Sequence, residues 1–226
     1  MPRVVYEEEP IFKDRTDAGR KLVERLGDFP GSEVVVFAIP RGGIPVAIEV
    51  AGKLVAPLDV VMPRKITIPD DPEAGFGAVT EDGTIVLNEP LVRRLELPEP
   101  VIQQQAEVTQ AEITRRTTVY RAHLPETNVD GKTAIIIDDG LASGYTMVAA
   151  VKSMKRRRAA RIVVAVPVAS GTAYDLVKRM VDELVCLVVA RTHGFAVASF
   201  YHHWRDLTDE DVLRYLADWR ATQVKK

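Results

Sequence analysis

Short runs of β-branched and other aliphatic residues recur along the chain and alternate with segments that repeat apolar positions at helical spacing. Five runs stand out, at residues 34–39, 58–62, 133–137, 162–166 and 184–189. Each run is apolar on both faces, which is typical of strands in a parallel sheet covered by helices on both sides. The pattern therefore predicts an α/β fold with a doubly wound, Rossmann-like parallel-sheet core.

The segment between the second and third runs follows a different pattern. Residues 77–80 and 84–87 flank Asp82-Gly83, a pair that strongly favours a β-hairpin. A polar segment at 99–123 then predicts a long helix with one apolar stripe, formed by Ile102, Ala106, Thr109, Ile113, Tyr120 and Leu124. We expect this hairpin and helix to form an insertion at about 66–125. A helix packed on its own core is favoured over a helix that forms a homodimer, which remains the alternative because narrow stripes occur in both settings.

Composition and charge exclude several classes of protein. The chain has 226 residues, 46% of them hydrophobic, and can bury roughly 70–75% of its unfolded surface in a core without disulfides. Thirty basic and 32 acidic residues give a net charge of −2, which argues against a general nucleic-acid binder. Any anion must therefore be bound by a local group of residues.

Cysteine usage and the N-terminal residues indicate the compartment. The single Cys186 lies in the apolar run at 184–189, so we expect a buried strand residue in a reducing environment. The first residues are acidic where a signal peptide needs an apolar core, and no apolar run approaches the roughly 18 residues of a membrane span. We therefore expect a cytoplasmic protein without a membrane partner.

The residues after the third run carry the most specific chemistry. Asp138 and Asp139 end the strand, and a turn of small residues leads into a helix. In an open parallel sheet, ligands bind outside the carboxyl ends of the strands. Backbone N–H groups from Leu141 to Thr146, the hydroxyls of Ser143 and Thr146 and the positive end of the helix together predict a phosphate-binding turn.

Two carboxylates beside a bound phosphate need a partner between them. Unit charges about 6 Å apart repel by roughly 3 kcal/mol at an effective dielectric constant near 20. A sugar diol can donate hydrogen bonds to the acids while its phosphate reaches the turn, and a hydrated Mg²⁺ can share the same acids. One Asp at this place could simply end the strand and cap the following helix. Two adjacent carboxylates beside a buried strand need hydrogen-bond donors or cations to compensate their charge. The pattern therefore predicts a sugar-phosphate site.

From Ala134 to Thr146 the chain resembles the signature of type I phosphoribosyltransferases: an apolar strand, two acids and a Ser/Thr-Gly-x-Thr loop that binds 5-phosphoribosyl 1-pyrophosphate. Every position matches except Gly140, where an aliphatic residue is usual. The resemblance implies that Asp138 and Asp139 hold the ribose hydroxyls and, through ligand or water, Mg²⁺. The residues implied to bind the 5-phosphate are Leu141, Ala142, Ser143, Gly144, Tyr145 and Thr146.

The rest of the chain also resembles an uncharacterised bacterial group of phosphoribosyltransferase-like proteins, with the same Asp-Arg-x-Asp-Ala-Gly start and Pro-Arg-Gly-Gly turn. That turn consists of Pro40, Arg41, Gly42 and Gly43 and directly follows the first run. We expect a second oxyanion site here, because Gly42 and Gly43 let backbone N–H groups face an anion and Arg41 adds a forked cation. An ordinary strand-to-helix turn is the alternative. In the resembled family this turn binds pyrophosphate and often contains a non-proline cis peptide, for which Pro40-Arg41 or a neighbouring bond is the candidate.

Arg64 and Lys65 follow the second run and are predicted to project from the same edge of the sheet. They resemble the Arg-Lys pair with which orotate-type phosphoribosyltransferases hold pyrophosphate, which implies a catalytic role. The stretch at 66–77 holds Asp70, Asp71 and Glu73 and no further Lys or His. If this acidic stretch is a loop that closes over the reacting centre, Mg²⁺ would have to lie between its carboxylates and the leaving pyrophosphate. The alternative is a solvated linker into the hairpin.

The segment after the last run offers a candidate for the acceptor. Phe195-x-Val197 is similar to the segment with which 6-oxopurine phosphoribosyltransferases stack and hydrogen-bond the base, so Phe195 is the base-stacking candidate. In that purine subclass the signature loop carries an acid that serves as general base, at the position of Ala142 here. The candidate substitutes for this acid are Glu73, Glu81 and His193.

Two further clusters favour structural roles. Adjacent His202 and His203 point to opposite faces if extended, which favours packing or surface positions over a shared metal site. The basic run at 155–158 closes a helix, where cations complement the negative end, and this favours a solvated helix terminus over a nucleic-acid patch.

Together these features predict one phosphoribosyltransferase domain over 1–226, with a core at about 30–190 and a small hood from about 1–30 and 191–226. The resemblance implies Mg²⁺-dependent transfer of the 5-phosphoribosyl group from 5-phosphoribosyl 1-pyrophosphate to a small nucleobase-like acceptor, as in nucleotide salvage. The alternative is a non-catalytic regulator that senses the same donor, although no basic helix-turn-helix segment precedes Val34. An acceptor that is not a base also remains open.

Overall fold

A six-stranded parallel sheet forms the centre of the computed structural model, which describes residues 1–27, 29–30, 33–69, 71–124 and 126–224. In spatial order the strands are β1 (Arg3–Val5), β9 (Glu183–Ala190), β8 (Arg161–Ser170), β7 (Thr133–Ile137), β2 (Val34–Ala38) and β3 (Leu58–Val60). The parallel core predicted from the five apolar runs is confirmed. The three-residue β1, which no sequence pattern signals, forms the edge beside β9.

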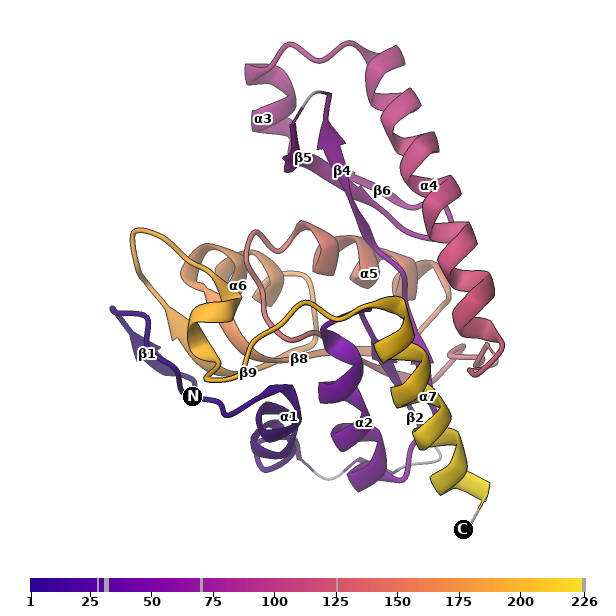
Figure 1. Cartoon of the computed structure of the whole chain (residues 1–226). Helices are drawn as coiled ribbons and strands as arrows, with labels where there is room; N and C mark the ends of the chain where they lie inside the picture. Colours follow the sequence, from indigo (N-terminus) through magenta and orange to yellow (C-terminus); the bar gives the residue numbers. More distant parts are fainter. Residues whose placement is uncertain (28, 31–32, 70, 125, 225–226) are drawn as a thin grey trace.

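Helices cover both faces of this sheet (Figure 1). One face carries α1 (Arg15–Val23), α2 (Gly43–Leu54) and α7 (Asp209–Val224), and the other carries α5 (Tyr145–Arg156) and α6 (Gly171–Lys178). Alternate residues of β2 divide between the two sides: Val36 packs in the cluster with α2, and Phe37 packs in the cluster with α5. This division explains why β2 is apolar at every position.

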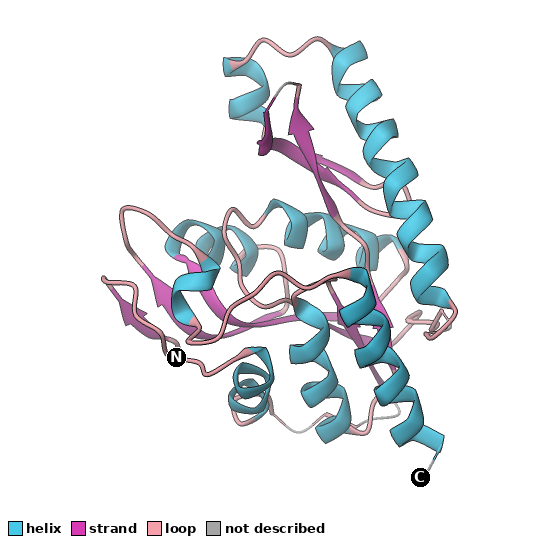
Figure 2. Cartoon of the chain, viewed as in Figure 1, coloured by secondary structure: helices cyan, strands magenta, loops and turns pink. Residues whose placement is uncertain are grey.

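A smaller antiparallel sheet projects from the core, next to two further helices (Figure 2). Its strands are β4 (Arg64–Ile68), β5 (Asp71–Val79) and β6 (Ile85–Leu87), and the helices are α3 (Glu89–Arg94) and α4 (Glu99–Arg121). The hairpin expected around Asp82-Gly83 is confirmed, and Gly83 has a φ of 76°. The expectation of a loop or linker at 66–77 is corrected, because β4 pairs with β5 and continues the hairpin as a third strand. Asp70 lies outside the described residues.

The stripe of α4 is buried as its spacing predicts. Ile102, Ala106, Ile113 and Tyr120 are all buried and belong to the same apolar cluster as β2 and α2. The long helix thus packs on the core of its own chain, which was the favoured alternative. Cys186 is also buried, as expected of a strand residue.

The C-terminal segment returns to the sheet through the short 3-10 helix η2 (Val197–Phe200). Phe12, Phe200 and Tyr201 form a separate apolar cluster with the end of β8, and this cluster joins the two ends of the chain. The division into a core and a hood stays a prediction. None of the helices in the described ranges combines the length and apolar character that a membrane crossing requires.

Candidate functional site

Two turns meet where β2 and β7 end. The amide of Ile39 donates to the carbonyl of Ile137 at 2.9 Å, so the turn that follows β2 lies against the first acid of the turn that follows β7. A Cβ on Gly42 would lie 1.9 Å from Oδ2 of Asp139, and a Cβ on Gly43 would lie 2.7 Å from the carbonyl oxygen of Ile137. The fold therefore brings together two motifs that are about 100 residues apart in the sequence.

Asp139 is held by a cation from the other end of the chain. Nε of Arg15 donates to Oδ2 of Asp139 at 2.7 Å, and the two side chains are only 9% and 14% exposed. The Arg15 guanidinium lies 3.8 Å from the ring centroid of Trp204, and Nη1 donates to the carbonyl of Arg205 at 2.9 Å. The Tyr201 hydroxyl donates to the carbonyl of Asp139 at 2.7 Å. These contacts fix the position of the second acid.

Asp138 has an unfavourable charge environment. Its Oδ1 accepts the amide of Asp139 at 2.8 Å. Burial raises the pKa of the Asp138 carboxyl well above its ordinary value, and the charge of Asp139 raises it further. Burial also raises the pKa of Asp139, although the Arg15 guanidinium opposes that shift. Within the described chain, one cation, Arg15, acts on both carboxylates. The two acids are therefore incompletely neutralised and can accept hydrogen-bond donors or positive charge from a ligand.

The turn after the acids exposes backbone N–H groups. Among the described residues, none accepts a hydrogen bond from the five amides at 142–146. Gly144 has a φ of 83°, which turns the chain into α5, and no described side chain caps that helix. Ala142 and Ser143 are exposed, which leaves their backbone and the Ser143 hydroxyl accessible at the positive end of the helix.

The prediction that the Leu141 amide binds the phosphate is wrong. The N–H of Leu141 donates to the carbonyl of Val168 at 2.9 Å, and its own carbonyl accepts the amide of Ser170 at 2.9 Å. The residue thus bridges to β8 and offers no free N–H group to a phosphate. The sequence could not indicate this, because the acceptor belongs to the neighbouring strand.

The glycine at position 140, where the resembled signature has an aliphatic residue, is explained by steric crowding. A Cβ there would lie 2.6 Å from a methyl carbon of Val197 and 3.1 Å from one of Val168. Val197 therefore occupies the space that an aliphatic residue at position 140 would need. The Phe195-x-Val197 segment is thereby packed directly against the turn that follows the acids.

The glycine turn after β2 differs in detail from the expectation. Gly42 has a φ of −62°, an ordinary helical value, so the steric limit comes from the approach of Asp139 and not from its backbone conformation. The amide of Gly43 donates to the carbonyl of Ile39 at 3.0 Å, which leaves the amides of Arg41 and Gly42 without an acceptor in the described chain. The Pro40-Arg41 peptide bond is cis, as the resemblance implies.

Arg64 and Lys65 occupy successive positions of β4, so their side chains leave opposite faces of the strand. Nη2 of Arg64 lies 2.8 Å from Oε2 of Glu112 on α4. A Cβ on Gly75 would lie 2.2 Å from Cγ of Lys65, so the Lys65 side chain runs across β5. Arg64 lies in the same group of charges as Arg41, and Lys65 faces the other way.

A cavity of about 450 Å³ borders the turn at Ala142. Phe195 lines it together with the N-terminus of α6 and the residues that follow β9, and its ring lies 5.6 Å from that of Phe200. His193 also lines this cavity. Glu81 instead accepts the amide of Met62 at 2.8 Å, and burial raises the pKa of its carboxyl, which indicates a structural role. The side chain of Glu73 lies outside the described part of the chain.

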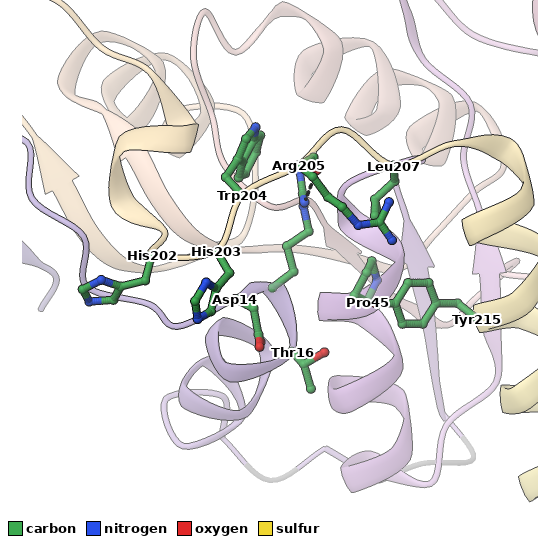
Figure 3. Close-up of a pocket in the computed structure, with 10 residues that line it drawn as sticks. Asp14, Thr16, Pro45, His202, His203, Trp204, Arg205, Leu207 and Tyr215 are labelled. Atoms are coloured by element: carbon green, nitrogen blue, oxygen red, sulfur yellow. Dashed lines mark hydrogen bonds between the residues drawn. The ribbon is translucent and has the colours of Figure 1, made fainter.

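A second cavity, of about 400 Å³, lies beneath the segment that joins η2 to α7 (Figure 3). Figure 3 shows side chains from α1, α2, α7 and this segment around it, among them Asp14, Pro45, His203 and Tyr215. Both His202 and His203 are exposed and line it. Arg15 lines this cavity, and neither Asp138 nor Asp139 does.

The described residues contain no group of three or more His, Cys, Asp or Glu side chains able to hold a metal ion. The donor set of Asp138 and Asp139 consists of two carboxylates, which suit Mg²⁺, but Mg²⁺ usually keeps several waters and ligand oxygens besides one or two carboxylates. The residues present therefore fit an Mg²⁺ that arrives with a phosphorylated ligand.

The sequence patterns missed two contributors to this site. Arg15 lies in the Asp-Arg-x-Asp-Ala-Gly start, and its role depends on a contact with Asp139 that no local pattern reveals. Arg116 lies on α4 at helical spacing from Ile113 and Tyr120, and its guanidinium lies among the charges of Arg41 and Arg64. The sequence signal for Arg116 is a cation at a position on the side of the helix that carries the apolar stripe.

Comparisons with known proteins agree with the residue pattern. The model of the family described as "Phosphoribosyl transferase domain" matches residues 80–202. Two Mycobacterium tuberculosis proteins, from strains CDC 1551 and H37Rv, are each named provisionally as a phosphoribosyl transferase and are 39% identical over 209 residues. These matches cover 91% of this chain and 46% of the relatives, so the chain spans about half the length of the curated relatives it matches. The crystal structure of TT1426 from Thermus thermophilus has a TM-score of 0.77 and 36% identity, and the alignment covers 92% of this chain and 99% of that one.

Proposed function

Because the chain belongs to the phosphoribosyltransferase family and has the type I fold, we propose that it transfers the 5-phosphoribosyl group from 5-phosphoribosyl 1-pyrophosphate to a nitrogenous, nucleobase-like acceptor and releases pyrophosphate. The single observation that carries this proposal is the juxtaposition at the end of β7. There, amides at 142–146 that have no acceptor in the described chain directly follow two carboxylates, and Arg15 donates a hydrogen bond to the second of them, Asp139. A sugar phosphate supplies both the anion for the amides and the hydroxyl donors for the acids.

The donor would lie across the ends of β7 and β2. Its 5-phosphate would accept hydrogen bonds from the amides of Ala142, Ser143, Gly144, Tyr145 and Thr146. Asp138 and Asp139 would accept from the ribose hydroxyls. The amides of Arg41 and Gly42 would face the pyrophosphate, with the Arg41 guanidinium close by. Arg64 would add a second cation, while the orientation of Lys65 supports a smaller part in this contact.

In the reaction, the bond from C1 to the pyrophosphate oxygen would break and the electron pair would leave with that oxygen. The acceptor nitrogen would form the new bond to C1 and lose its proton to water or to a side chain of the cavity, such as His193. The negative charges of Asp138 and Asp139 would favour the positive charge that develops on the ribose. Mg²⁺ bound with the donor would neutralise the pyrophosphate oxygens, and the two acids would hold it through the ribose hydroxyls or water.

The acceptor would occupy the cavity of about 450 Å³ beside Ala142. This position supports Phe195 as the stacking residue, since its ring lines the cavity and is braced by Phe200. The backbone groups of Ala196 and Val197, which follow Phe195, would then hydrogen-bond the edge of the base. Phe195→Ala should raise KM for the acceptor and leave donor affinity unchanged.

Calorimetry with the donor and Mg²⁺ tests the site. The double variant Asp138→Asn with Asp139→Asn should lose donor binding, whereas Asp130→Asn, at an acid that pairs with the exposed Arg158, should bind as the unmodified protein does. Near-native affinity in the double variant would refute the site. Pyrophosphate exchange screened across nucleobases then separates enzyme from regulator: turnover with one base supports transfer, and tight donor binding without exchange supports a sensor.

A further inference from the structure

Four arginines from three separate elements converge beside the glycine turn. Arg41 belongs to the turn after β2, Arg64 opens β4, and Arg115 and Arg116 lie on α4. We call these four residues the arginine cluster. Two carboxylates, Glu112 of α4 and Asp209 of α7, lie among them. The four arginines and these two acids together carry a formal excess of two positive charges.

Asp209 lies close to three arginines but accepts no hydrogen bond from any of them. Its carboxylate lies 3.9 Å from Nη1 of Arg41, 3.8 Å from Nη2 of Arg115 and 3.7 Å from Nε of Arg116. None of these separations is a hydrogen bond. The hydrogen bond that Asp209 does accept in this group comes from the Tyr120 hydroxyl, at 2.7 Å.

Arg116 has an unmet hydrogen-bond requirement. Its Nε is buried and has no hydrogen-bond partner in the described chain. Leaving a buried donor unpaired is unfavourable, so a ligand that offers an oxygen here gains a contact that the protein does not make by itself. Arg64 and Arg116 both lie beside Glu112, and Arg41 and Arg116 both lie beside Asp209, so the three cations are close neighbours. Burial lowers the pKa of Arg64, and the charges of Arg116 and Arg41 lower it further.

The exposure of the side chains favours a small ligand over a macromolecule. Arg41, Arg64 and Arg116 are 36%, 34% and 22% exposed, whereas Arg115 is 63% exposed. Three of the four guanidinium groups are thus partly enclosed between α4, β4 and α7. A nucleic-acid backbone would need them on an open surface.

We propose that Arg116 directly contacts the pyrophosphate group bound at the glycine turn, and that Asp209 is the internal counter-ion of the arginine cluster that the pyrophosphate displaces. The identity of the anion rests on the proposed function, because the donor carries its pyrophosphate towards the glycine turn. Forked guanidinium groups suit phosphate oxygens, which they can hold in pairs.

The proposal also accounts for a gap in the sequence pattern. The stretch at 66–77 contains acidic residues and no Lys or His with which to neutralise a leaving pyrophosphate. The inserted helix α4 brings Arg115 and Arg116 to the place where such cations are needed. The positive charge comes from the insertion and not from the residues that follow Lys65.

Titration calorimetry with inorganic pyrophosphate alone tests the inference. Arg116→Gln should weaken binding about tenfold or more, since a lost charge-assisted hydrogen bond is of this size. Arg116→Lys should give an intermediate affinity, because it keeps the charge and loses the fork. Asp209→Asn should bind pyrophosphate several-fold more tightly, because the competing charge is gone while an oxygen remains for Tyr120.

The matched control is Arg93→Gln on α3, an exposed cation outside the cluster that pairs with Glu89, and it should leave the affinity unchanged. Ribose 5-phosphate, which lacks the pyrophosphate, should bind equally to the unmodified protein and to Arg116→Gln. Unchanged pyrophosphate affinity in both Arg116 variants overturns the inference even if the donor binds. Pyrophosphate binding that depends on Arg116, without any ribose 5-phosphate binding, instead counts against the proposed function and leaves the anion site standing.

Discussion

Nε of Arg15 and Oδ2 of Asp139 lie 2.7 Å apart, although the two residues are 124 positions apart in the chain. Arg15 begins α1, and Asp139 follows β7. The contact therefore joins the N-terminal helix to the turn that would hold the ribose. Trp204 covers the guanidinium at 3.8 Å, so a third segment of the chain keeps this pair out of solvent.

Arg15→Ala should destabilise the protein and weaken donor binding. The substitution leaves the largely buried carboxylate of Asp139 without its cation, and breaking such a pair costs roughly 3 kcal/mol. Thermal unfolding measures the loss. Arg20→Ala is the control on the same helix, because the Arg20 side chain is 68% exposed and its pair with Glu49 should contribute little. Equal unfolding temperatures for the two variants would contradict the role given to Arg15.

Asp138→Asn should stabilise the ligand-free protein at neutral and higher pH. Because the pKa of Asp138 is raised in the folded state, the folded chain keeps a proton that the unfolded chain releases. That contribution to stability is fully present below the ordinary pKa of about 3.9 and is lost as the pH rises through the raised value. The variant, which does not titrate, avoids the loss.

The expected gain in Tm for Asp138→Asn is a few degrees at pH 8, since about 1 kcal/mol corresponds to 2–4 °C in a chain of this size. The difference should shrink as the pH falls towards the ordinary Asp pKa. Asp206→Asn, at an exposed side chain, should show neither effect. A variant with a lower Tm than the unmodified protein at pH 8 would contradict the reasoning. Donor binding should fall in the same variant, so stability and function oppose each other at this position.

Gly42→Ala should impair the site and also destabilise the fold. The added methyl group would lie 1.9 Å from Oδ2 of Asp139 and would displace that carboxylate from Arg15. Donor affinity should fall at least about tenfold, the value of one lost charge-assisted hydrogen bond. Gly27→Ala is the control, because no heavy atom of the described chain lies within 4 Å of its Cβ position. Unchanged donor affinity in Gly42→Ala would show that the carboxylate can move without consequence.

Asp59→Ala should destabilise the junction between the core and the insertion. Asp59 is fully buried, accepts the amides of Val60 and Thr127 at 2.6 and 2.8 Å, and pairs with Arg121 at the end of α4. Removing the carboxylate leaves these donors unpaired and should cost roughly 3 kcal/mol, or about 6–12 °C in Tm. Asp130→Ala removes an exposed pair with Arg158 and should change Tm by little.

The strands and the acid turn could be predicted because their signals are local. Val34 to Ala38 are apolar at every position, as a strand covered on both faces must be, and the Asp138-Asp139 pair precedes small residues that free the backbone amides. The apolar stripe of α4 could also be predicted, since Ile102 and Ile113 are buried at the positions that helical spacing indicates.

The contacts that set the charge of the site could not be predicted, because they join distant segments. Arg15 reaches Asp139 only after α1 packs beside the sheet, and Asp209 meets Arg41 only after α7 returns across it. The loss of Leu141 as a donor has the same cause, since its N–H is taken by the adjacent strand β8. Gly42 looked like a backbone requirement, whereas its real constraint is the space that Asp139 needs.

The parallel pairing of β1 with β9 sets an order of assembly. Arg3 pairs with Val188 and Val5 with Ala190, so the first of these strands that a ribosome makes finds its partner in the last one. Closing so long a loop costs entropy before any contact rewards it. The nascent chain must therefore hold residues 3–5 without their strand partner until β9 has been made.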